Sequence, residues 1–127
     1  MNNTFTFLLM IFCHIVDDYY LQGILASMKQ RSWWEENYPQ KSYSYDYIMA
    51  LAMHAMSWAF MIMWPVLFVM GQQVRASFVI AFIVNVIIHA VIDDLKANKL
   101  KINLVQDQLI HLAQIVVTWL VIIVLDV

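Results

Sequence analysis

Four long stretches of mainly apolar residues alternate with shorter polar segments along the chain. They predict helices over about 4–27, 46–70, 76–95 and 104–125, each near the roughly 20 residues that cross a bilayer. Short segments join the second, third and fourth stretches, and short connections favour antiparallel neighbours. Pro65 lies inside the second stretch, where a membrane helix tolerates it. The pattern predicts an all-α, polytopic membrane protein, with four transmembrane helices in one antiparallel up-down bundle over residues 1–127.

The composition indicates that lipid is the solvent of much of this surface. The chain is 63% hydrophobic and 13% charged, whereas a soluble domain carries about twice that share of charged residues. The net charge of −2 and the lack of an extended basic patch exclude a nucleic-acid partner. Cys13 is the only cysteine, which excludes an intramolecular disulfide and a cysteine-based zinc cluster.

The first apolar stretch is interpreted as a mature helix rather than a secretory signal. It lacks a positively charged start, and His14, Asp17 and Asp18 interrupt it. The connector that follows is rich in tryptophan and tyrosine. These rings suit the headgroup level of a membrane, or alternatively they could stack a ligand.

The connectors on one side of the predicted bundle carry most of the positive charge. The first and third connectors hold Lys29, Arg31, Lys41, Lys96, Lys99 and Lys101, whereas the second holds Arg75. The positive-inside rule then predicts a bacterial inner-membrane protein with these two connectors in the cytoplasm and both termini in the periplasm. Cysteine labelling at Gln72 and Asn98 tests this orientation.

Histidine and aspartate recur four residues apart in three of the predicted helices. The pairs are His14 with Asp18, His89 with Asp93, and Asp107 with His111. Residues four apart share a helix face. His54 lacks such a carboxylate. At 1.5 Å per residue, the four histidines lie roughly 10–15 Å from the helix ends on the positively charged side. The spacing therefore predicts a polar cluster at one depth inside the bundle.

Longer polar stripes extend these pairs. They comprise His14, Asp18 and Gln22, continued by Lys29; Asn85, His89, Asp93 and Lys96; Asp107, His111, Gln114 and Thr118; and His54 with Ser57. The two halves of the chain resemble a repeated hairpin, although four helices could match by coincidence.

Imidazole and carboxylate groups are ligands of first-row metals, and helix bundles build such sites from inward-facing side chains. The expected ligands of one or two divalent transition-metal ions (Zn, Mn or Fe) are His14, Asp18, His54, His89, Asp93, Asp107 and His111. An open coordination position would support hydrolysis of an amphiphilic or phosphorylated substrate. Asp17 or Asp94 could act as general base, or could cap and solvate a helix end. Gln22, Lys29, Lys96 and Gln108 are expected to face the substrate, with the lysines attracting an anionic headgroup.

Three other readings stay open. The cluster could be a structural hydrogen-bond network between helices, or a relay for protons or ions. The chain could also be a non-enzymatic factor, for example phage-encoded, that binds a host membrane protein. Exposed apolar faces make a homo-oligomer plausible, but no Gly-x-x-x-Gly face supports one.

The motif order resembles a family of unknown function found in small bacterial and phage inner-membrane proteins. The resemblance is carried by His14-x3-Asp18-x3-Gln22, His89-x3-Asp93-x2-Lys96 and Asp107-Gln108-x2-His111, with Lys29 and His54 between them. It covers nearly the whole chain, with Asp18-Tyr19 where the family has Asp-Phe. A more distant similarity is to inner-membrane proteins described as metal-dependent hydrolases, and it implies hydrolysis by analogy alone.

Overall fold

The computed structural model describes residues 2–125, and within them the chain forms helices and no strand. In chain order, the elements are α1 (Asn3–Val16), the π-helical η1 (Asp17–Leu21), α2 (Leu25–Met28), α3 (Arg31–Asn37), the 3₁₀-helical η2 (Lys41–Tyr43), α4 (Asp46–Val69), α5 (Ala76–Ala97), α6 (Leu104–Trp119) and the π-helical η3 (Leu120–Leu125). α4 continues unbroken through Pro65.

Four helical segments are long and apolar enough to cross a membrane. They are Asn3–Leu21, Lys41–Val69, Ala76–Ala97 and Leu104–Ile122. Each coincides with one of the four apolar stretches in the sequence. The fold therefore belongs to the class of helical proteins that a bilayer can accommodate.

The first helix is shorter than the predicted range of 4–27. It ends at Leu21, and the chain turns at Gly23, whose φ of +50° lies in the left-handed region that favours glycine. A new short helix, α2, starts at Leu25. Apolar residues resume directly after Gln22 and Gly23, so the apolar pattern did not reveal the end of the helix.

The last turn of the first helix is π-helical. Asp17 and Asp18 follow each other in sequence, yet both are buried. A π-turn holds more residues than an α-turn, which changes the angle between successive side chains. This local widening accompanies two adjacent carboxylates that both face the interior.

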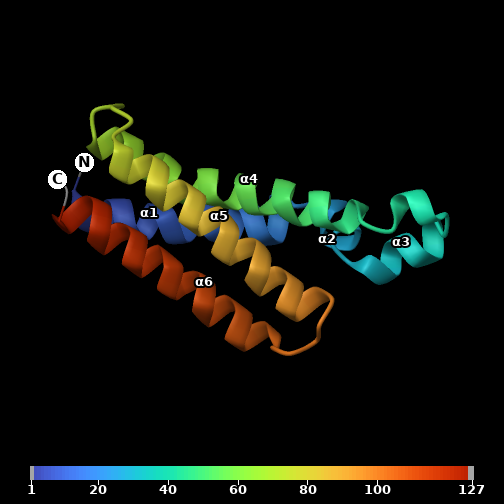
Figure 1. The fold of residues 1–127 in the computed structure, drawn as a ribbon. Helices are drawn as coiled ribbons and strands as arrows, with labels where there is room; N and C mark the ends of the chain where they lie inside the picture. Colours follow the sequence, from blue (N-terminus) through green and yellow to red (C-terminus); the bar gives the residue numbers. More distant parts are fainter. Residues whose placement is uncertain (1, 126–127) are drawn as a thin grey trace.

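The four long helices pack in a ring. α4 packs against α1 and α5, and α6 packs against α5 and α1. In Figure 1 both termini and the α4–α5 turn lie at one end, whereas α2, α3 and the α5–α6 connection lie toward the other. The half nearer the termini encloses an apolar core that includes Met10, Ile62 and Ile115.

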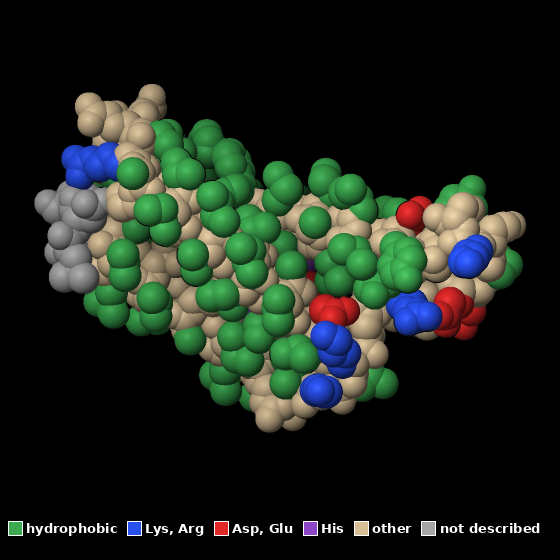
Figure 2. Space-filling view, in the orientation of Figure 1, with side chains coloured by type: hydrophobic (Ala, Val, Ile, Leu, Met, Phe, Trp, Pro, Cys, Tyr) green, Lys and Arg blue, Asp and Glu red, His purple; other side chains and the backbone are tan. Residues whose placement is uncertain are grey.

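Apolar side chains cover much of the outer surface. Figure 2 shows hydrophobic side chains over α4, α5 and α6, while charged side chains gather around α3 and the α5–α6 connection. Ile80, Ile87 and Val117 are each more than half exposed. Such a surface fits contact with lipid rather than water.

A capping box fixes the start of α6. The Asn103 side chain accepts a hydrogen bond from the Gln106 backbone N–H, and the Gln106 side chain accepts one from the Asn103 N–H. Asp107 and His111 are four residues apart on α6, so they share its inward face in adjacent turns, and both are buried.

Candidate metal centre

The four histidines come from four different helices and meet in the interior. His14 lies on α1, His54 on α4, His89 on α5 and His111 on α6, and each is at most 2% exposed. Three aspartates, at positions 18, 93 and 107, are buried with them. The structure thus brings together the cluster that the sequence spacing predicts.

Two histidines and one carboxylate form the first group that could hold a metal ion. The Nε2 atom of His54 lies 3.2 Å from Nε2 of His89 and 3.4 Å from Oδ1 of Asp18. Nε2 of His89 lies 4.0 Å from the same Asp18 oxygen. Ligand atoms about 2.0–2.2 Å from a tetrahedral ion lie about 3.4 Å apart. The three atoms therefore nearly match three corners of a tetrahedron and leave a fourth open.

Asp17 lies on the far side of the His54 ring. Its Oδ1 accepts a hydrogen bond from the Ser57 hydroxyl at 2.6 Å, and its Oδ2 lies 3.8 Å from Nδ1 of His54. A carboxylate behind a metal-binding histidine favours the tautomer that carries its hydrogen on Nδ1. That tautomer leaves the Nε2 lone pair of His54 directed toward Asp18 and His89.

His89, Asp93 and His111 form the second group that could hold a metal ion. Nε2 of His111 lies 3.5 Å from Oδ1 of Asp93 and 3.3 Å from Oδ1 of Asp107. The rings of His89 and His111 stack, with centroids 4.1 Å apart. The two groups are contiguous, because His89 belongs to both.

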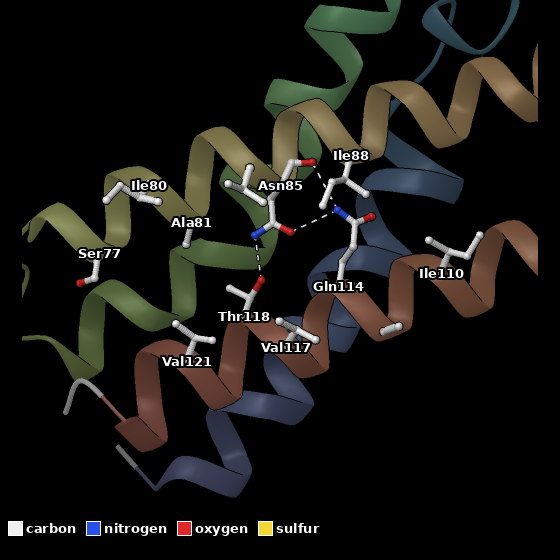
Figure 3. Close-up of a pocket in the computed structure, with 12 residues that line it drawn as sticks. Ser77, Ile80, Ala81, Asn85, Ile88, Ile110, Gln114, Val117, Thr118 and Val121 are labelled. Atoms are coloured by element: carbon white, nitrogen blue, oxygen red, sulfur yellow. Dashed lines mark hydrogen bonds between the residues drawn. The ribbon is translucent and has the colours of Figure 1, made fainter.

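An amide network sets the orientation of His111. Its Nδ1 lies 3.1 Å from the Gln114 side-chain oxygen, while the Gln114 NH₂ group donates to the backbone carbonyl of Asn85. A backbone carbonyl can only accept, so it fixes which way the Gln114 amide points. His111 must then donate from Nδ1, and its Nε2 faces the carboxylates of Asp93 and Asp107, with a lone pair when the ring is neutral. Asn85 in turn donates to Thr118 at 2.8 Å (Figure 3).

Asn85, Gln114 and Thr118 also line a groove between α5 and α6. The groove has a volume of about 590 Å³, and most of its walls are apolar side chains such as Ile80, Ile88, Ile110, Val117 and Val121 (Figure 3). The polar cluster is therefore linked through Gln114 to an apolar groove on the surface of the helices.

Two lysines neutralise part of the buried negative charge. Nζ of Lys29 lies 2.6 Å from Oδ2 of Asp93, and Nζ of Lys96 lies 2.6 Å from Oδ2 of Asp107. Lys29 is 8% exposed and reaches the cluster from α2, beyond the turn at Gly23. Both lysines, which the sequence analysis assigns to an anionic headgroup, are thus engaged by carboxylates of the cluster.

His14 has hydrogen-bond partners at both ring nitrogens. The Trp58 indole N–H donates to Nδ1 at 2.8 Å, so Nε2 carries the hydrogen and donates to the Gln108 oxygen at 3.1 Å. The Gln108 NH₂ group donates to Oδ2 of Asp18 and to Oδ2 of Asp107. Gln108 therefore orients two carboxylates, and His14 helps to orient Gln108.

Asp94 and Gln22, two further candidate site residues from the sequence, lie outside the cluster and at its edge, respectively. Asp94 lies outside the cluster and contacts the Asn98 amide and the Lys99 ammonium, as a residue at a helix end would. Gln22 donates to the backbone oxygen of Asp18, at the edge of the cluster.

Several buried polar atoms in the cluster have no hydrogen-bond partner in the part of the chain that the structure describes. They are Oδ2 of Asp17, Oδ1 of Asp18, Oε1 of Gln22, Nδ1 of His54, Nδ1 of His89, Oδ1 of Asp107 and Nε2 of His111. A buried polar atom without a partner costs free energy. A bound cation is the ligand that would satisfy the lone pairs directed toward one another.

Sequence reasoning missed two residues that shape the site. Trp58 stacks on His89 with ring centroids 4.2 Å apart, besides its bond to His14. Its spacing of four from His54 places it on the same helix face, and this signal was present in the sequence. Asn98 accepts from the Arg31 N–H and donates to the Lys29 carbonyl, joining α5 to the α2–α3 segment. No sequence pattern pointed to it.

Fold and site define a class: a helical protein with four helices fit to cross a membrane and a buried His/Asp group that could hold a metal ion. A family model described as protein of unknown function (DUF3307) matches residues 5–127, so the chain belongs to the DUF3307 family. The resemblance to a family of unknown function is thereby confirmed over nearly the whole chain. No curated protein and no solved structure matches it.

Proposed function

We propose that this protein is an integral membrane protein that binds a divalent transition-metal ion at Asp18, His54 and His89. The observation that carries the proposal is the convergence of three buried acceptor atoms with separations of 3.2–4.0 Å. Two histidines and one carboxylate, with one position open, make up the ligand set of many catalytic zinc and iron sites. Zn, Mn and Fe are the candidate ions.

The four long helices form an antiparallel up-down bundle across a bacterial inner membrane in this proposal. Lys29, Lys96 and Lys99 lie at the end of the molecule that holds the cluster, and this end faces the cytoplasm by the positive-inside rule. Both termini then face the periplasm. The exposed apolar surface of α4, α5 and α6 supports contact with lipid (Figure 2).

The reaction class that such a centre supports is hydrolysis. A bound metal ion polarises an ester or phosphoryl oxygen and lowers the pKa of bound water. The water oxygen would join the carbon or phosphorus atom, the bond to the leaving alcohol would break, and one proton of the water would end on that alcohol. The buried aspartates are the groups close enough to hold the proton in transit.

The surroundings of the cluster support an amphiphilic substrate. The groove between α5 and α6 has apolar walls and adjoins His111 through Gln114. A groove of about 590 Å³ lies within the usual size range of small-molecule sites. Lys29 and Lys96 reduce the negative charge that would otherwise repel an anionic headgroup.

Metal content tests this proposal. The full chain, purified in detergent without chelator and offered Zn, Mn and Fe, should retain a stoichiometric ion measurable by elemental mass spectrometry. His54→Gln should lose it, because it removes one of three ligands. Asp94→Asn is the control: it changes a carboxylate next to Asp93 in sequence that lies outside the cluster and contacts Asn98 and Lys99, and it should keep the ion.

The outcomes separate the possible functions. If the folded wild-type chain binds no metal, the ion site is excluded, and a structural network or a relay for protons or ions is left. Metal-loaded protein should also hydrolyse p-nitrophenyl phosphate or p-nitrophenyl esters in mixed micelles, and His54→Gln should not. Retention of metal without any hydrolysis would leave a metal-binding membrane protein that is not an enzyme of this class.

A further inference from the structure

Asp93 belongs to the second group of possible metal ligands and also faces His54 of the first, because its two oxygens point to different histidines. Oδ2 lies 3.4 Å from Nε2 of His54 and 3.8 Å from Nε2 of His89, whereas Oδ1 lies 3.5 Å from Nε2 of His111. We propose that the centre is binuclear, with a second ion held by His111, Asp107 and Asp93, and with Asp93 bridging the two ions. This inference rests on the proposed function, which supplies the first ion.

The second ion would occupy a place where buried lone pairs face one another. Nε2 of His111 and Oδ1 of Asp107 are 3.3 Å apart, both residues are 0% exposed, and neither atom has a hydrogen-bond partner within residues 2–125. The amide network places a hydrogen on Nδ1 of His111, so in the neutral ring Nε2 is an acceptor that faces Oδ1 of Asp107. A cation between them removes the repulsion.

Neighbouring side chains donate to one oxygen each of Asp93 and Asp107 and leave the Oδ1 atoms available to an ion. Lys96 and Gln108 donate to Oδ2 of Asp107, and Lys29 donates to Oδ2 of Asp93. Oδ1 of each carboxylate is thereby turned toward His111. Partners of this kind fix metal ligands in place in known metal sites. His89 can then be a ligand of the first ion only, because Asp107 takes its place among the three ligands of the second ion.

The charge of a binuclear centre narrows the substrate class. Asp17, Asp18, Asp93 and Asp107 carry four negative charges when ionised, and Lys29 and Lys96 supply two positive ones. One divalent ion balances the remaining two negative charges, and a second ion gives the cluster a net charge of two positive units. That surplus suits a phosphoryl group rather than a neutral ester, and paired ions about 3.5–4 Å apart are the arrangement that clamps phosphoryl oxygens.

The substrate inferred here is a phosphomonoester of an amphiphilic alcohol. In its hydrolysis, the oxygen of water bonds to phosphorus and the bond between phosphorus and the alcohol oxygen breaks. One proton of the water ends on the alcohol, and the other stays on the phosphate. No oxidant or further reactant is needed.

Stoichiometry and magnetic coupling test the second ion. The full chain loaded with Mn²⁺ in detergent should hold two ions, and its electron paramagnetic resonance spectrum should show a coupled pair. His111→Gln and Asp107→Asn should each hold one ion with the spectrum of an isolated Mn²⁺. Asp94→Asn is the control: it changes a carboxylate that lies outside the cluster and contacts Asn98 and Lys99, so it should keep both ions and the coupling.

These measurements distinguish failure of this inference from failure of the proposed function. A wild-type chain with one ion, unchanged in His111→Gln, overturns the second ion and leaves the first. A wild-type chain with no ion overturns both. The number of bound Mn²⁺ ions and the spectrum of the wild-type chain test the second ion by themselves. A variant that does not fold therefore does not invalidate the test.

Two phosphate probes test the substrate class on the Mn²⁺-loaded chain. Phosphatidic acid in the micelle should raise the unfolding temperature by several degrees and inorganic phosphate by less, and neither should do so in His111→Gln. An equal effect of the two probes overturns the amphiphilic part of the inference. No effect of either overturns the phosphoryl part.

Discussion

Several buried polar residues of the cluster have their orientation fixed by hydrogen bonds to neighbouring side chains. Gln108 is the clearest case, since it accepts from His14 and donates to Asp18 and Asp107. Such partners decide which oxygen or nitrogen remains free. Trp58 extends this arrangement by donating to His14 and stacking on His89. The residues around the candidate ion sites are therefore part of the site.

The hydrogen bond from Trp58 to His14 should contribute measurably to stability. Trp58→Phe removes the only donor that Trp58 offers and leaves Nδ1 of His14 buried without a partner. We expect the free energy of unfolding to fall by about 1–3 kcal/mol. Denaturant unfolding in detergent, followed by circular dichroism, measures this change.

Trp64→Phe serves as the matched control for that experiment. Trp64 lies on the same helix but is 45% exposed, and its recorded contacts are with the rings of Phe60 and Phe68. The change should alter stability by no more than about 0.5 kcal/mol. An equal loss in both variants would show that the indole donor has no special role.

The break between η1 and α2 is the element that the apolar pattern concealed. A continuous helix to Ser27 would carry the chain straight past the cluster. The turn at Gly23 instead places α2 beside α4, and Lys29 reaches Asp93 at 2.6 Å. One glycine in a left-handed conformation therefore helps to bring a buried positive charge to the site.

Replacing Gly23 by alanine should affect both stability and the site. At φ +50° a Cβ atom is strained, and the cost is about 1–2 kcal/mol. We expect reduced stability together with weaker metal retention, because the position of Lys29 depends on this turn. Thermal unfolding and elemental analysis of the same preparation measure the two effects.

Gly71→Ala separates backbone strain from the effect on the site. Gly71 has φ +61° and lies in the α4–α5 turn, at the opposite end from α2 (Figure 1). It should lose similar stability while retaining metal. Equal metal loss in both variants would contradict the role assigned to the Gly23 turn.

At the scale of the whole molecule, the buried His, Asp and Lys side chains are confined to one half of the helical fold. The half nearer the termini is filled by residues such as Met10, Ile62 and Val66, and the cluster occupies the other half. Buried ionisable groups are costly in a membrane protein and usually serve a function. This asymmetry agrees with a site that opens toward one face of the membrane.

The proposed orientation predicts which loops a membrane-impermeant thiol reagent can reach. In a Cys13→Ala background, cysteine at Gln72 should be labelled from the periplasm, and cysteine at Leu100 should be labelled after the membrane is opened. Leu100 replaces Asn98 in this test, because Leu100 is 81% exposed whereas the Asn98 side chain holds Lys29 and Arg31 in place. Labelling of Leu100→Cys in intact cells would contradict the orientation.

The sequence by itself predicted the helical class and the residues of the cluster. Apolar stretches of membrane length are a local property, so four helices followed from composition alone. Four-residue spacing likewise placed His89 with Asp93 and Asp107 with His111 on shared faces, which needs only helix geometry. The structure confirms the helical class with four helices long and apolar enough to cross a membrane, and the family match covers residues 5–127 without assigning a function.

Contacts between residues distant in the chain were decided only by the tertiary structure. His54 has no carboxylate one turn away, yet it meets Asp17, Asp18 and Asp93 from two other helices. Which histidine is already engaged, as His14 is, depends on partners 44 and 94 residues away. Helix periodicity fixes which residues share a face, but the rotation of each helix and the direction of each hydrogen bond depend on packing. The division between metal-binding and orienting residues therefore required the folded molecule.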